Sequence, residues 1–139
     1  MTEPVMAEEG AADADGEGAA RIRAIYAARG AQVPASVEAR IELAESVDRM
    51  DALEAVENLK RALIAQSALD AKTEQLIQFA QLLVLGHAAT AAAHVRGARR
   101  AGASMAELTA VVEHAAITAG LPAYTRGMDI LVELAKESS

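Results

Sequence analysis

Two of the three histidines in this chain of 139 residues stand seven positions apart, at His87 and His94, in a run of small residues typical of a helix. With 3.6 residues per turn, positions seven apart lie almost on one line, so both imidazoles should project from the same side of residues 86–102. Small side chains share that stripe: Thr90, Ala91 and Ala98. We interpret this side as the floor of a pocket in which an imidazole can exchange a proton near neutral pH.

Each histidine also has a plainer explanation. His94 is the candidate acid–base group, and a buried, hydrogen-bonded histidine is the alternative. His87 follows Gly86 at the expected start of the helix. The helix dipole there favours a neutral imidazole that can accept a proton, although a simple N-terminal helix residue explains it as well. His114 belongs to a later helix, off its main apolar stripe, and is expected to enter the pocket or to fill a subunit contact.

Three arginines fall on the opposite side of the same helix: Arg96, Arg99 and Arg100. The simplest interpretation is a solvated face whose charge is favourable near a helix C-terminus. A carboxylated ligand, however, needs a guanidinium that binds it through two hydrogen bonds, and Arg96 is the first candidate, with Arg126 the second. Polar side chains elsewhere are candidate ligand contacts, although packing explains each one alone: Gln75, Thr90 and Thr118.

Metal and thiol chemistry find little support in the sequence. His87 and His94 are two turns, about 10.5 Å, apart along a helix axis. One zinc ion with bonds of about 2.0–2.1 Å cannot easily bridge them, so we expect no metal and no cofactor except at a site shared between subunits. The chain contains no cysteine, which removes disulfides, thiol redox chemistry and cysteine metal sites.

Helix signals follow one another along the chain, and neither alternating strand patterns nor hairpin turn dipeptides occur. Helices are predicted over residues 20–29, 36–47, 48–64, 70–86, 87–102, 104–120 and 123–136. The expected N-caps are Ser36, Asp48, Asp70 and Ser104, the last in a capping box with Glu107. The glycines expected to end helices are Gly30, Gly86, Gly102 and Gly120.

Apolar residues at three- and four-residue spacing mark the faces that we expect to be buried. On the third predicted helix they are Leu53, Val56, Leu59, Leu63 and Ile64. On the fourth they are Thr73, Leu76, Ile77, Ala80, Leu83 and Val84. The run 88–93 is rich in alanine and lets backbones approach closely, so helices 70–85 and 87–101 should form a central antiparallel pair covered by the others. The prediction is a compact all-α bundle of several helices.

Composition supports this fold class. Hydrophobic residues make up 53% of the chain, many of them alanine, and only 2% are aromatic. Residues 1–19 hold acidic side chains and no basic one, so we predict a disordered acidic tail there, with a docking element as the alternative. Residues 20–139 are predicted to form a single domain.

Location and partners follow from what the sequence lacks. No apolar run approaches the roughly 20 residues of a membrane span, and the N-terminus has no signal-peptide pattern, so a cytoplasmic protein without membrane contact is expected. The net charge of −7 argues against nucleic acid as a partner.

Three stretches of the chain resemble the carboxymuconolactone decarboxylase family, which shares a superfamily with the alkylhydroperoxidase-D proteins. Residues 69–77 are similar to the helix that opens the family's motif region. Residues 94–102 resemble its histidine–arginine–alanine helix ending in glycine. Glu107, His114 and residues 119–123 fit its next helix and the Gly-x-Pro-Ala turn after it. The resemblance implies the all-α alkylhydroperoxidase-D-like fold and a homo-oligomer, trimer or hexamer, with active sites beside subunit contacts.

Departures from the family pattern narrow the chemistry. The hydroperoxidase branch carries a Cys-x-x-Cys motif and a following histidine, where this chain has His87, Thr90 and His94. Gln75 stands where that branch has a glutamate. Because peroxide reduction of this type needs a thiolate, no peroxidase activity of that kind is expected. The decarboxylase branch carries histidines at positions that resemble His94 and His114, and its tyrosine corresponds to Thr118.

The sequence therefore predicts a cofactor-free acid–base enzyme, a decarboxylase-like carbon–carbon lyase or a related proton-transfer or isomerisation enzyme. Its substrate would be a small carboxylated lactone or enone. Histidines and an arginine could hold the developing enolate and move the proton. The alternative is a non-catalytic ligand-binding or scaffold member of the superfamily.

Overall fold

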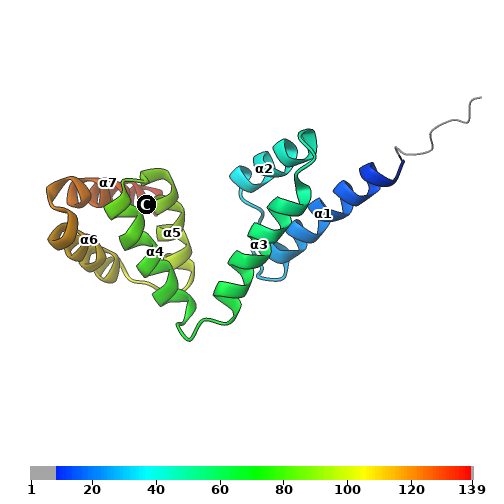
Figure 1. Cartoon of the computed structure of the whole chain (residues 1–139). Coiled ribbons are helices and arrows are strands. Elements are labelled where there is room, and N and C mark those ends of the chain that lie inside the picture. The colour runs from blue at the N-terminus through cyan, green and yellow to red at the C-terminus, as the bar shows by residue number, and fades with distance from the viewer. Residues whose placement is uncertain (1–8, 139) are drawn as a thin grey trace, which may run out of the picture. The chain divides into compact units, whose positions relative to one another are not determined.

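The computed structural model describes residues 9–138, with side chains from residue 16 onward. Within this part the chain is all helical, which confirms the predicted fold class (Figure 1). The helices are α1 Glu9–Ala27, α2 Ala35–Ser46, α3 Met50–Ala65, α4 Ala71–Leu85, α5 Ala88–Arg100, α6 Met105–Ala119 and α7 Leu121–Glu137. None of the described helices is long and apolar enough to cross a bilayer.

The contacts divide the chain after Ser67 into two compact units. That residues 20–139 form a single domain stays a prediction. The first unit contains α1–α3 and the second contains α4–α7. Each has a hydrophobic cluster of its own, so the apolar residues are shared between two small cores.

In the first unit α1 begins at Glu9, inside the segment predicted to be a disordered tail. Residues 1–8 of that predicted tail lie outside the described residues. Ala19 and Ile22 of α1 are buried. Arg21 binds Glu54 of α3 through two hydrogen bonds of 2.7 and 3.0 Å. Contact with α3 thus supports a helix that composition alone argues against.

The face that α3 buries differs from the prediction. Val56, Leu59 and Leu63 are 53%, 59% and 66% exposed, whereas Met50 and Glu57 are buried. The Glu57 carboxylate is 2% exposed and accepts hydrogen bonds from Tyr26 Oη at 2.8 Å and Lys60 Nζ at 2.7 Å. Leu53 of the predicted face does pack against the cluster of the first unit, so α1 and α2 cover one edge of this face and leave Val56, Leu59 and Leu63 exposed.

The predicted helix boundaries hold where a side-chain cap forms. Asp70 accepts a hydrogen bond from the Thr73 backbone N–H, and Ser104 forms the predicted capping box with Glu107. Two predicted N-caps are wrong. Ser36 lies inside α2, and Asp48 has a φ of 54° two residues before α3 begins at Met50.

In the second unit four helices enclose a cluster that includes Phe79 and Leu83 of α4 and Leu108 and Val112 of α6. The prediction for α4 is wrong at Ile77 and Val84, which are exposed. The observed buried stripe passes through Phe79 and Leu83 instead, because α5, α6 and α7 cover that side of α4.

The helices α4 and α5 pack closely along their length. They are joined by the short connection Gly86–His87, and Gly86 has the left-handed φ of 84° that suits a glycine. Gln75, near the start of α4, lies against Gly97, near the end of α5, so the two helices run antiparallel. A Cβ atom at position 97 would stand 2.5 Å from Gln75 Oε1, so the glycine makes room for the Gln75 side chain between the two helices.

Candidate functional site

His94 of α5 and Gln75 of α4 are the two predicted site residues that the structure joins directly. His94 Nδ1 lies 2.9 Å from Gln75 Oε1. A side-chain carbonyl oxygen can only accept a hydrogen bond, so the imidazole donates from Nδ1. The other ring nitrogen, Nε2, then carries the lone pair, and it makes no hydrogen bond within the described part of the chain.

Burial sets the electrostatics of this pair. Desolvation lowers the pKa of the half-buried His94 below its usual value of 6.5. Gln75 is neutral, so it does not offset that effect as a carboxylate would. His94 is therefore a neutral imidazole at pH 7, in which Nδ1 is hydrogen-bonded to Gln75 and Nε2 carries an available lone pair. This arrangement can take a proton from a bound molecule.

The rest of the predicted stripe does not gather around His94. His87 and Thr90 are exposed, and His87, the N-cap of α5, makes no side-chain cap hydrogen bond. Ala91 and Ala98 are fully covered, both at 0% exposure. The reason is that the buried line of α5 follows Ala91, Val95 and Ala98, which divides the predicted stripe between core and surface.

His114 and Thr118 of α6 lie together in a groove between α4 and α6 of about 570 Å³. Its lining includes Ala80, Gln81, Val84 and Leu85 of α4, together with Ala115 and Ile117. No acidic side chain, lysine or arginine lines this groove. The apolar spacing of α4 could have indicated this groove, because Ala80 and Val84 belong to the stripe that the sequence predicts to be buried.

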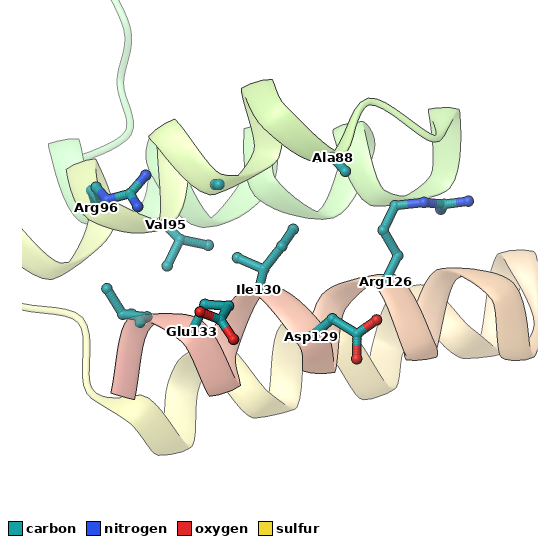
Figure 2. A pocket seen from close by; sticks show the side chains of 9 residues that line it. Ala88, Val95, Arg96, Arg126, Asp129, Ile130 and Glu133 are labelled. Atoms are coloured by element: carbon teal, nitrogen blue, oxygen red, sulfur yellow. The ribbon is translucent and has the colours of Figure 1, made fainter. Parts of the chain in front are cut away.

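Arg96 lines a second groove, of about 310 Å³, between α5 and α7. Figure 2 shows Arg96 and Arg126 toward its two ends, with Ile130 between them. Arg96 is paired with Glu137 at 2.7 Å, which raises the pKa of the guanidinium. Arg126 donates a hydrogen bond to the Leu83 carbonyl oxygen. Both candidate carboxylate-binding residues therefore hold protein oxygens here.

This second groove also includes residues that the sequence did not single out. They are Asp129, Ile130, Glu133 and Leu134 of α7, facing Ala88, Ala92 and Val95 of α5. Their spacing along α7 is helical, and it is the one signal by which the sequence could have marked them. Among the described residues, no group of three or more histidine and acidic side chains is placed to hold a metal ion.

Comparison with known families finds a match to the part of the chain that forms α3 to α7. The model of the carboxymuconolactone decarboxylase family matches residues 50–133, from the first residue of α3 into α7. The chain belongs to this family, which confirms the resemblance inferred from its motifs. No curated protein and no solved structure matches the chain significantly.

Proposed function

We propose that this member of the family is a cofactor-free acid–base enzyme that acts on a small carboxylated lactone or enone, with His94 as the group that takes and returns the proton. The observation that carries the proposal is the hydrogen bond of 2.9 Å between His94 Nδ1 and Gln75 Oε1. It leaves the lone pair on Nε2, and the lowered pKa of His94 keeps that lone pair free at pH 7. A general base needs both properties.

The tautomer favours one order of steps. Decarboxylation of such a substrate breaks the bond between the carboxyl carbon and its neighbour, releases carbon dioxide and leaves the electron pair on the conjugated carbonyl as an enolate. The enolate then needs one proton, which neutral His94 does not carry on Nε2. Decarboxylation consumes this proton, so it comes from the solvent: His94 takes it up on Nε2 as an imidazolium and then delivers it to the enolate carbon, which returns the imidazole to its neutral form.

Binding of the substrate carboxylate is the second part of the proposal. Arg96 contacts Glu137 of α7, whereas His94 contacts Gln75 of α4, so the two side chains leave α5 on different sides. An α-helix is about 10 Å wide, so one small substrate does not reach both within a single chain. We therefore propose that Arg96, and the groove residues His114 and Thr118, act on a substrate held at His94 of another copy in a homo-oligomer. Thr90 and His87 are exposed and fit the same role.

Loss of the carboxyl group from carboxymuconolactone is the activity to test first, followed by release of carbon dioxide and by uptake of deuterium from heavy water into the product. His94→Gln keeps a hydrogen-bonding side chain but cannot exchange a proton at neutral pH. It should lower kcat by about 10²–10⁴-fold. Because the Gln side chain can still reach Gln75, the melting temperature should change little.

His87→Gln is the matched comparison, because it removes an exposed imidazole from the same helix. We expect a milder loss than at position 94. Full activity of His94→Gln on a substrate that the unsubstituted chain converts would overturn the acid–base role of this residue.

Ligand binding without turnover is the second candidate function. The observation in its favour is that the α4–α6 groove and the α5–α7 groove are largely apolar and that His94 lines neither of them. A family member of this kind would bind candidate substrates, measured by calorimetry, with equal affinity in the unsubstituted chain and in His94→Gln. It would release no carbon dioxide and incorporate no deuterium from the solvent.

A further inference from the structure

The first unit leaves more large apolar side chains exposed than it buries, among its described residues. Four large apolar residues form its core with two alanines: Ile22, Val37, Ile41 and Met50. Five others are at least half exposed: Leu43, Val47, Val56, Leu59 and Leu63. Exposed apolar surface of this extent on a small unit marks a surface that is covered by a partner.

Three of the exposed residues lie on one line of α3. Together with Ala52 and the C-cap Gln66 they recur at alternating spacings of four and three residues, which is the spacing of a helix-pairing seam. We call Ala52, Val56, Leu59, Leu63 and Gln66 the α3 seam. The opposite side of α3 is already used, because Met50 and Glu57 are buried against the rest of the first unit.

We propose that the α3 seam binds the α3 seam of a second copy of this chain, with the two helices antiparallel. The seam is complementary to itself only in that direction. With a two-fold axis at Leu59, the small Ala52 faces the long Gln66, and Val56 faces Leu63. A parallel pair would place Ala52 opposite Ala52, which leaves a gap, and would place two Gln66 amides opposite each other.

Charges at the seam permit such a contact. The seam residues carry no charge, and on one side they are flanked by Ala55 and Ala62, which let two backbones approach closely. On the other side stands Lys60, whose ammonium group is 2.7 Å from the Glu57 carboxylate and is thus neutralised within its own chain. The two-fold axis at Leu59 brings the Lys60 side chains of the two copies to one edge of the contact, where each is paired with Glu57 of its own chain.

The contact does not involve His94 or Gln75, so it can be tested independently of the proposed chemistry. In the full chain, Leu59→Glu with Leu63→Glu places four carboxylates in the two-fold interface. We expect the mass measured by light scattering to fall by a factor of about two, since each two-fold contact joins two copies. Val132→Glu is the matched control, because Val132 is also about half exposed but lies on α7. An unchanged mass of the double variant would overturn the proposal.

Single cysteines test the direction without threatening the fold, since the chain has no cysteine of its own. In Leu59→Cys, a short bis-maleimide cross-linker should join position 59 of one copy to position 59 of the other. Ala52→Cys and Gln66→Cys should each stay uncoupled alone and couple when the two variants are mixed. Arg61→Cys, on another side of α3, is the control that should not couple. Failure of Leu59→Cys to couple, or efficient coupling of Ala52→Cys to itself, would overturn the antiparallel seam.

Discussion

The two units of this chain each hold a polar pair or cluster between helices, and they treat it in opposite ways. In the first unit the buried Glu57 carboxylate accepts one hydrogen bond from Tyr26 and one from Lys60. In the second unit the His94 imidazole uses one nitrogen to hold Gln75 and leaves the other free. Each oxygen of the Glu57 carboxylate accepts a hydrogen bond, so this cluster stabilises the contact between α1 and α3. The His94–Gln75 pair leaves the lone pair of Nε2 available, so it can react.

Burial shifts the pKa values of Tyr26 and His94 in opposite directions. Burial is the main cause that raises the pKa of Tyr26, because the neutral phenol is favoured away from water, and the hydrogen bond to Glu57 adds to it. Burial lowers the pKa of His94, because the neutral imidazole is favoured. In both cases the uncharged form is kept. A phenol that keeps its proton is a stable donor, whereas an imidazole without its second proton is a base.

The largest expected effect on stability comes from breaking the first cluster. Tyr26→Phe removes the donor to the buried Glu57 carboxylate without changing the ring. An unsatisfied buried acceptor costs about 1–3 kcal/mol, and the free energy of unfolding should fall by this amount in a denaturant titration. Activity should not change. If His94→Gln destabilised the chain as much as Tyr26→Phe does, the contrast between a structural cluster and a chemical pair would not hold.

Replacing Gln75 by an acidic residue converts the neutral His94–Gln75 pair into a charged one. Gln75→Glu places a carboxylate beside His94 Nδ1 and favours the imidazolium, so the pKa of His94 should rise by about 1–3 units. The pH below which activity falls should rise with it, measured as kcat/KM against pH. His94 titration can be followed separately by NMR. A pH profile that does not move would mean that His94 is not the titrating base.

Of the two polar sites, alkaline pH should act on the cluster of Tyr26, Glu57 and Lys60, because the His94 imidazole is already uncharged at neutral pH. The pKa of Tyr26 is raised in the folded chain, so the stabilisation by its protonated hydroxyl is fully present below the unfolded pKa of 10.0. It is lost as the pH rises through the higher folded value, because a phenolate beside Glu57 is repelled. Denaturant titrations above pH 10 should show this loss in the unsubstituted chain, and Tyr26→Phe should lack this component.

Particular residues show how much of the structure can be predicted from the sequence. The caps at Asp70 and Ser104 are local interactions, so the beginnings of α4 and α6 could be predicted from spacing alone. The stripe on α3 was visible too, but periodicity does not say which side of a helix is covered. Likewise Gln75 and His94 were each singled out, whereas their contact depends on the antiparallel register of α4 and α5. Gly97 makes room for the Gln75 side chain at this contact.

The smallest expected change in stability, and the sharpest test of the reactive pair, is Gly97→Ala. The added Cβ would stand 2.5 Å from Gln75 Oε1, so the flexible Gln75 side chain must move away from it. Alanine is favoured over glycine inside a helix by up to about 1 kcal/mol, which offsets that displacement, so the free energy of unfolding should change little. The hydrogen bond to His94 Nδ1 should nevertheless be lost, and with it the preference for the tautomer that leaves Nε2 free. Activity should therefore fall while stability is kept, and nitrogen NMR of the imidazole should report a mixture of both tautomers. Retention of full activity with a single Nε2-unprotonated tautomer would mean that Gln75 does not position the base.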